Sequence, residues 1–225
     1  MPAQQPADAG RSPDQVRSPR VVADRHWLLT WTTYGTWLPG DDRGFVSNVA
    51  DSDGRGVRHN APHTACDRSV PHLREFARSK LVSEPVWLTL SQAEAVLDQF
   101  RETAEYRRWF LLAVSVMRNH AHLVVGVPGD PDPDDLLRDF KSYGSRRLNQ
   151  AFGRRPRWWT EGGSKRKKAD ERAVATAIRY VLHQPHALVT WSPDERPGER
   201  PALAGCSSPE PSLTPEQPAD AGRSL

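Results

Sequence analysis

The stretch that decides the fold is Trp109–Val127, with the sequence WFLLAVSVMRNHAHLVVGV. Its two apolar halves, Trp109–Val116 and Ala121–Val127, flank the short segment Met117-Arg118-Asn119, which reads as a turn. Two strands joined by so short a connection run antiparallel. The stretch therefore predicts an antiparallel strand pair.

Two histidines, His120 and His122, stand at the start of the second strand. Side chains two residues apart on a strand project from the same face. Imidazole is a common metal ligand, so the pair predicts a site for one divalent metal ion. The alternative is a pair of core histidines that hydrogen-bond to the backbone.

A later segment, Ala173–His183, has the pattern of a helix that ends before Pro185. Tyr180 and Gln184 are four positions apart, so we expect them to lie one turn apart on one side. A hydroxyl and an amide oxygen would then face the same way. The alternatives are that the Tyr180 ring packs and that Gln184 only ends the helix.

The remaining elements alternate between strands and helices. A Gly/Pro turn region covers 34–41. Ser91 and Glu94 have the spacing of a capping box that opens a helix. The pattern indicates an α+β fold, a ferredoxin-like sandwich in which helices pack on a central antiparallel β-sheet. The other expected elements are a strand at 26–33 and helices at 72–80, 91–106 and 132–151.

Both ends of the chain are rich in Pro, Ala, Asp, Gly, Arg and Ser and lack a hydrophobic period. We expect disordered tails at 1–24 and 192–225 and one folded domain at 25–191. The octapeptide QPADAGRS occurs in both tails, at 5–12 and 217–224. Neither copy is able to pack a core.

No apolar stretch is long enough to span a bilayer, and the first residues lack the apolar segment of a signal peptide. We therefore expect a cytoplasmic protein that does not enter the membrane. The two cysteines lie far apart in the sequence, so we expect no disulfide framework. The set His59, His63, Cys66 and His72 fits no standard zinc spacing, and an ordinary polar loop is the favoured interpretation.

The net charge is only +3, but basic residues cluster around two tryptophans. Interleaved cations and aromatic rings suit a phosphate backbone and unstacked bases, although most charge runs are merely solvated loops. The predicted nucleic-acid surface consists of Arg154, Arg155, Arg157, Trp158, Trp159, Lys165, Arg166, Lys167 and Lys168.

Three segments together resemble a known family. Val116–Val125 resembles the His-hydrophobic-His (HUH) strand of single-tyrosine transposases. Tyr180–Pro185 resembles the tyrosine helix of the branch called REP-associated tyrosine transposases, where Tyr-Ile-x-x-Asn-Pro is usual. Leu29–Gly40 is similar to the start of many members. The His-x-His triplet alone is weak, but the three segments in this order are specific.

The chain departs from the family pattern at two positions. Gln184 stands where this branch often has Asn. Related insertion-sequence transposases use Gln there as a metal ligand, so the side-chain oxygen is kept. Ala121 is the small apolar residue between the histidines.

The resemblance implies an enzyme that cleaves and rejoins single-stranded DNA at hairpin (REP-like) sequences. His120, His122 and Gln184 would hold Mg²⁺ or Mn²⁺, and Tyr180 would attack the phosphate to give a 5′-phosphotyrosine intermediate. Arg118 would contact the scissile phosphate, although turn formation explains the neighbouring Asn119 equally well. The resemblance also implies a homodimer, and a monomer is the alternative. We expect the protein in a bacterial-type cytoplasm, in association with the nucleoid.

Three alternatives remain. Tyr143 is a rival nucleophile, since it also follows the triplet on a helix, but Arg147 stands four positions on in place of a ligand. A replication or relaxation nickase would use the same HUH chemistry. A domesticated DNA-binding regulator would keep the basic surface without cutting.

Overall fold

The computed structural model describes residues 22–43, 48–50, 56–58 and 69–193. Most of the two predicted tails, both copies of the octapeptide, and the candidates His59, His63 and Cys66 lie outside the described residues. The disorder predicted for the tails therefore stays a prediction.

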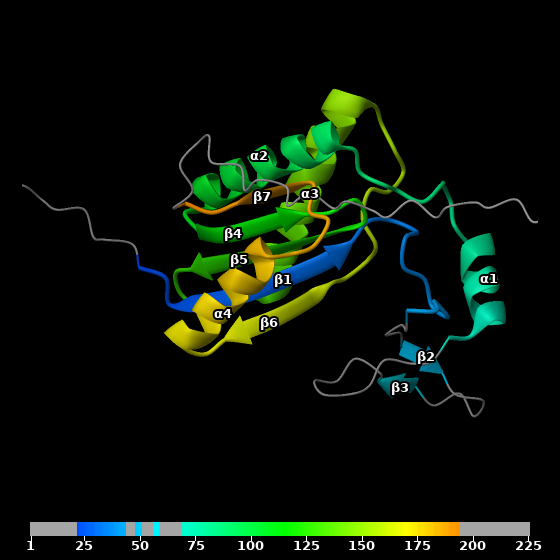
Figure 1. The fold of residues 1–225 in the computed structure, drawn as a ribbon, viewed down its shortest axis with the longest axis horizontal. Coiled ribbons are helices and arrows are strands. Elements are labelled where there is room, and N and C mark those ends of the chain that lie inside the picture. Colours follow the sequence, from blue (N-terminus) through cyan, green and yellow to red (C-terminus); the bar gives the residue numbers. More distant parts are fainter. Residues whose placement is uncertain (1–21, 44–47, 51–55, 59–68, 194–225) are drawn as a thin grey trace, which may run out of the picture. The chain divides into compact units, whose positions relative to one another are not determined.

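A five-stranded antiparallel sheet forms the centre of the described fold, with the strand order β6-β1-β5-β4-β7 (Figure 1). The predicted strand pair is β4 and β5, which places β5 in the middle of the sheet. A separate two-stranded sheet consists of β2 (Asn48–Ala50) and β3 (Gly56–Arg58). The strands of the large sheet are β1 (Arg25–Thr32), β4 (Phe110–Val116), β5 (His120–Val127), β6 (Ser164–Lys168) and β7 (Val189–Trp191).

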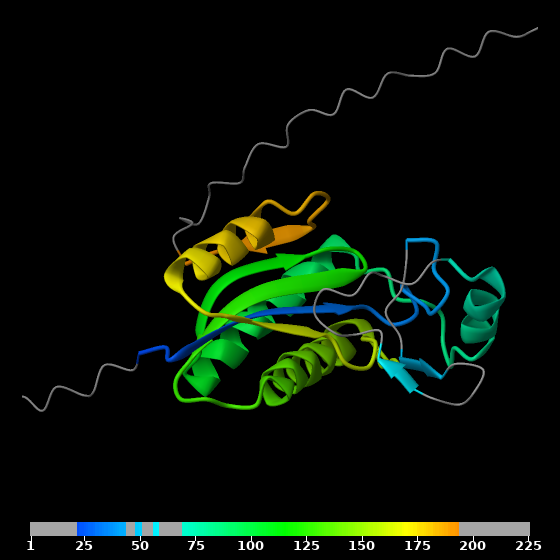
Figure 2. The ribbon, with the colours of Figure 1, turned by 90° about the horizontal axis from the view of Figure 1, so that it is seen from below.

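Helices cover both faces of the sheet. The crossover helices α2 (Leu90–Arg107) and α3 (Pro133–Phe152) pack on one face, and α4 (Glu171–Leu182) packs on the other (Figure 2). Another helix, α1 (Pro71–Ser79), precedes α2. The α+β prediction is confirmed, and β1-α2-β4-β5-α3-β6 follows the ferredoxin-like order. No helix within the described ranges is long and apolar enough to cross a membrane.

The main core lies between the sheet and helices α2 and α3. Leu29 and Trp31 of β1 point into it, as do Ala121 and Leu123 of β5. Because side chains alternate along a strand, the residues between these core residues on β1 and on β5 face α4. Strand register is therefore what separates the buried apolar side chains from the candidate site residues.

Aromatic rings fill the centre of the main core. Trp31 makes edge-to-face contacts with Phe100, at 5.4 Å between ring centroids, and with Trp159, at 6.1 Å. Phe100 makes the same kind of contact with Phe140, at 5.5 Å. Pairs of this geometry add stabilisation beyond the burial of their area.

The start of α2 differs from the prediction. Thr89, and not Ser91, is the N-cap: its hydroxyl accepts from the Gln92 N–H, and the Gln92 side chain accepts from the Thr89 N–H. The sequence Thr-Leu-Ser-Gln satisfies the capping-box pattern as well as Ser91 with Glu94 does. The Ser91 and Glu94 assignment was therefore wrong by two residues.

Two short edge strands were missed. The cations at 165–168 were predicted only as part of the nucleic-acid surface, but residues 164–168 pair with β1 as β6. Residues 189–191 pair with β4 as β7. β6 consists of Ser, Lys and Arg and has no apolar alternation. β7, with the sequence Val-Thr-Trp, alternates over only three residues, which is too short to indicate a strand.

Replacing Phe140 by alanine should lower the free energy of unfolding by about 3–5 kcal/mol, because the fully buried ring leaves a cavity among other aromatic rings. Urea unfolding followed by tryptophan fluorescence measures the change. The matched control is Phe152→Ala on the same helix, whose ring is 40% exposed and which should cost less than about 1 kcal/mol. Equal losses in both variants would contradict this account of the core.

Candidate functional site

The histidine pair lies on the α4 face of the sheet. Ala121 and Leu123 face the main core, so His120 and His122 face away from it. Their ring centroids are 4.9 Å apart, and the two rings are nearly perpendicular. The strand therefore holds two imidazoles side by side, as the spacing predicted.

Each imidazole is held through its Nδ1 atom. His120 Nδ1 lies 2.7 Å from the Asn119 side-chain oxygen, and His122 Nδ1 lies 2.6 Å from the Thr30 hydroxyl oxygen. Thr30 stands directly opposite His122 in the β1–β5 register. When Nδ1 carries the proton and donates it, Nε2 presents its lone pair, and this is the tautomer that a metal ligand needs.

Burial keeps both rings neutral. His122 is only 5% exposed, and its burial, with a smaller effect of His120, lowers its pKa to about 4. Burial also lowers the pKa of His120, and the positive charge of Arg43 adds to that effect. Neutral imidazoles keep the lone pair that binds a metal ion.

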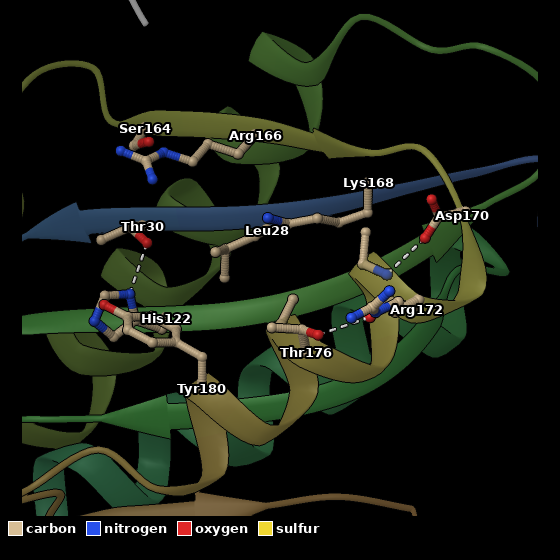
Figure 3. A pocket seen from close by; sticks show the side chains of 12 residues that line it. Leu28, Thr30, His122, Ser164, Arg166, Lys168, Asp170, Arg172, Thr176 and Tyr180 are labelled. Atoms are coloured by element: carbon tan, nitrogen blue, oxygen red, sulfur yellow. Dashed lines mark hydrogen bonds between the residues drawn. The ribbon is translucent and has the colours of Figure 1, made fainter. Parts of the chain in front are cut away.

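Tyr180 of α4 comes to the same place. Its ring centroid lies 5.3 Å from that of His122, in an edge-to-face contact, and its side chain is half exposed. Figure 3 shows the Tyr180 ring reaching from α4 toward His122. The helix is fixed at its start by Asp170, whose carboxylate accepts from the Ala173 N–H. One chain therefore brings the histidines and the tyrosine together.

Gln184 lies beyond the end of α4, because the helix ends at Leu182 and His183 is its C-cap. The recorded hydrogen bond of the Gln184 side chain runs from its Nε2 to the Tyr180 carbonyl oxygen, at 2.9 Å. Among the described residues, no group of three His, Cys, Asp or Glu side chains forms a metal site. Metal binding by Gln184 stays a prediction.

The rival nucleophile Tyr143 lies on α3, which packs on the opposite face of the sheet from the histidines. The Arg146 guanidinium covers its ring at 5.1 Å. The sheet therefore separates Tyr143 from the histidine pair.

The predicted nucleic-acid surface is not one surface. Trp158 and Trp159 are 3% and 7% exposed and belong to the main core. Their indole N–H groups donate to the Asn149 side chain and to the Lys141 carbonyl. The expectation that these two rings form an exposed surface was wrong, because both rings pack in the main core, where Trp159 contacts Trp31.

The arginines before these tryptophans stay at the surface. Arg154 and Arg157 are exposed, and Arg155 donates to the Glu84 carbonyl and lies over the Trp158 ring. Arg118, in the turn between β4 and β5, is also exposed. Their contribution to DNA binding stays a prediction.

The cations of β6 alternate between the two faces of the sheet. Lys165 pairs with Asp134 of α3, and Lys167 lies near the Trp27 ring. Arg166 and Lys168 instead line a cavity of about 660 Å³ between the sheet and α4, which His122 and Tyr180 also line (Figure 3). Only half of this basic run therefore faces the candidate site.

Several residues of this site were not found from the sequence. Arg172 and Thr176 line the cavity at positions i−8 and i−4 from Tyr180, and this spacing was a signal that the sequence offered. Thr30 gave no such signal, because its place opposite His122 depends on the strand register.

Another residue that the sequence analysis missed is Arg43, in the loop that follows β1. It binds Asp41, lowering the pKa of that carboxyl to about 2, and it donates to the Thr36 carbonyl. The Thr36 hydroxyl in turn donates to the Asn119 carbonyl. This loop therefore supports the turn that carries Asn119 and His120.

Comparisons with known proteins agree with this geometry. Residues 84–184 match the model of the family described as "Transposase IS200 like". This segment contains both crossover helices, the histidine strand β5, the tyrosine helix α4 and Gln184. No curated protein gives a significant match.

Two solved structures show weaker similarity. One is a REP-associated tyrosine transposase bound to a REP hairpin, at 10% identity and a TM-score of 0.41, covering 78% of this chain and 70% of that one. The other, from Deinococcus radiodurans R1, is described as a transposase, at 16% identity and a TM-score of 0.38, covering 73% and 95%. At these TM-scores neither structure supports transfer of any property.

The family match includes His120, His122 and Tyr180, the residues that the fold brings together at one site. Over residues 84–184, the chain is similar to the IS200-like transposase family.

Proposed function

We propose that the protein is a metal-dependent DNA strand transferase that cleaves and rejoins single-stranded DNA through Tyr180. The observation that carries the proposal is the contact between Tyr180 and His122, with ring centroids 5.3 Å apart in a half-open cavity. A nucleophile and a candidate metal ligand beside each other are what phosphoryl transfer by a tyrosine requires.

The histidine pair fits a divalent ion of the Mg²⁺ or Mn²⁺ class. Both rings are neutral, and both Nδ1 atoms are occupied by oxygen partners, which favours coordination through Nε2. A bound ion would neutralise charge on the phosphate oxygens. Imidazole ligands favour Mn²⁺ over Mg²⁺ by affinity. Gln184 would have to turn its amide oxygen toward the pair to join them.

Tyr180 would supply the nucleophile. Its oxygen would form a bond to phosphorus while the bond to the 3′ oxygen of the preceding nucleotide breaks, leaving a 3′-hydroxyl and a 5′-phosphotyrosine. The covalent bond keeps the energy of the phosphodiester, so a second 3′-hydroxyl is able to reverse the step without ATP. This property distinguishes a strand transferase from a simple nuclease.

The substrate class rests on charge and on the sequence resemblance. Arg166, Lys168 and Arg172 line the cavity beside Tyr180, which suits a phosphate backbone. The preference for hairpin (REP-like) DNA follows from the resemblance. Because His122 and Tyr180 of one chain are in contact, we propose that each protomer acts with its own tyrosine, whether the protein is a monomer or a homodimer.

Replacing Tyr180 by phenylalanine should abolish covalent capture of single-stranded DNA, because the attacking oxygen is lost. The measurement is an SDS-stable protein–DNA adduct formed with added Mn²⁺. Tyr143→Phe is the control and should capture DNA as the wild type does, since Tyr143 lies on the other face of the sheet. A wild-type protein that binds DNA without forming an adduct would favour the non-cutting regulator.

Thr30→Val should weaken Mn²⁺ binding by about tenfold or more, because the partner of His122 Nδ1 is lost. Calorimetric titration of the DNA-free protein measures this, and His122→Ala should remove most of the heat. The control is Thr103→Val, which removes a mostly buried hydroxyl from α2, away from the site. Unchanged Mn²⁺ affinity in Thr30→Val would show that this hydroxyl does not orient the ligand.

The protein without metal should lose stability as the pH falls from about 6.5 toward 4. The folded pKa of His122 is lowered to about 4, so in this window the unfolded chain binds a proton that the folded protein does not. Denaturant unfolding in EDTA should show a loss of about 2–3 kcal/mol by pH 4.5.

His122→Gln should flatten this pH dependence, and His183→Gln, which removes an exposed imidazole, should leave it in place. The loss due to Asp41 belongs to a lower window, because its folded pKa is about 2. Identical pH profiles for wild type and His122→Gln would contradict the assignment.

A further inference from the structure

The cavity beside Tyr180 has a chemistry of its own. One part is apolar, formed by Leu28 of β1 and by Ala173 and Ala177 of α4. The other part is cationic, formed by Arg166 and Lys168 of β6 and by Arg172 of α4. Figure 3 shows the β6 side chains extending along the sheet and Arg172 standing on the opposite helix. An apolar floor between two charged sides suits a flat ring that carries an anion.

These three cations are not neutralised. Several other cations of this chain have carboxylate partners, such as Arg25 with Asp130 and Arg107 with Asp139. Within the described ranges, no salt bridge is recorded for the three cavity cations. The carboxylate that lines the cavity, that of Asp170, accepts the Ala173 N–H as the helix cap. The cavity therefore has an excess of positive charge, which an anion would balance.

The cavity has room for a ligand. Its volume of about 660 Å³ lies within the usual range for small-molecule sites. Small alanine side chains on α4, and not larger ones, keep the space between helix and sheet open. The same space continues to Tyr180 and His122.

We propose that this cavity holds one unpaired nucleotide next to the phosphate that Tyr180 attacks, with the base on Leu28, Ala173 and Ala177 and the phosphate between Arg166, Lys168 and Arg172. The inference rests on the proposed function and adds to it a defined nucleotide subsite. It replaces the exposed tryptophan surface expected from the sequence.

The subsite should discriminate little between bases. The Thr30 hydroxyl is engaged with His122, and the Thr176 hydroxyl donates to the Arg172 carbonyl. The base therefore meets an apolar floor, and recognition depends on stacking area and charge, which every base provides. Target sequence would have to be read elsewhere.

The test measures binding of single-stranded DNA to full-length Tyr180→Phe protein, which binds without cutting. The probe is a fluorescent oligothymidine of about twelve nucleotides, followed by anisotropy at several salt concentrations. Arg172→Gln and Arg166→Gln should each weaken binding about five- to tenfold and reduce the salt dependence by about one phosphate contact. Circular dichroism melting shows that each variant is folded.

Matched controls lie on the same elements. Arg179→Gln removes an exposed cation of α4 that does not line the cavity, and Lys167→Gln removes a cation on the other face of β6. Both should change the affinity less than about twofold. If the cavity variants behave as these controls do, the subsite is disproved.

A third variant tests the place of the base. Ala173→Leu fills the floor without changing charge, so it should weaken binding of oligothymidine but not of an abasic oligonucleotide of the same length. Equal effects on both probes would disprove a base on the floor. The adduct assay separates this proposal from the proposed function. If wild type and Arg172→Gln bind DNA with equal affinity and form equal amounts of adduct, the subsite alone is disproved. If the wild type forms no adduct, strand transfer itself is disproved.

Discussion

The antiparallel pairing of β1 with β5 is the constraint on which the rest of the structure depends. Its register places Leu29 against Leu123 toward the main core and Thr30 against His122 toward α4. A shift by one residue would turn the histidines into the core and expose the leucines. The large apolar area of the main core therefore fixes the position of two polar rings on the opposite face.

Burial of His122 controls its protonation as well as its packing. An unperturbed histidine, with a pKa of about 6.5, is still partly protonated near neutral pH, and a protonated ring cannot bind a metal ion. Desolvation of His122, between the sheet and α4, keeps it neutral well below that range. Protonation of this ring opposes folding in acid, so the burial that keeps this candidate ligand neutral also lowers the stability of the protein in acid.

Much of this arrangement was predictable, because it depends on local pattern. The apolar run 109–127 predicted the strand pair, and the spacing of His120 and His122 predicted their common face. The Tyr180 helix was also found, and all of these rest on periodicity. Trp158 and Trp159 were misassigned because basic residues nearby in the sequence do not predict whether an aromatic ring is buried. Their burial depends on packing with residues far away in the sequence. β6 and the role of Thr30 depend on pairing between segments at least 92 positions apart. The helix pattern also did not show that α4 ends at Leu182, two residues before Gln184.

The two faces of the sheet differ greatly in how much they bury. In the described part of the chain, twenty-two buried residues form the core under α2 and α3, whereas five, Leu28, Ala113, Val124, Ala177 and Val181, anchor α4. Detaching α4 from the sheet would therefore expose far less apolar surface than unfolding the molecule. The candidate nucleophile Tyr180 therefore lies on a helix that few buried residues hold, and α4 is able to leave the sheet, with the tyrosine moving away from the histidines, while the rest of the fold stays intact.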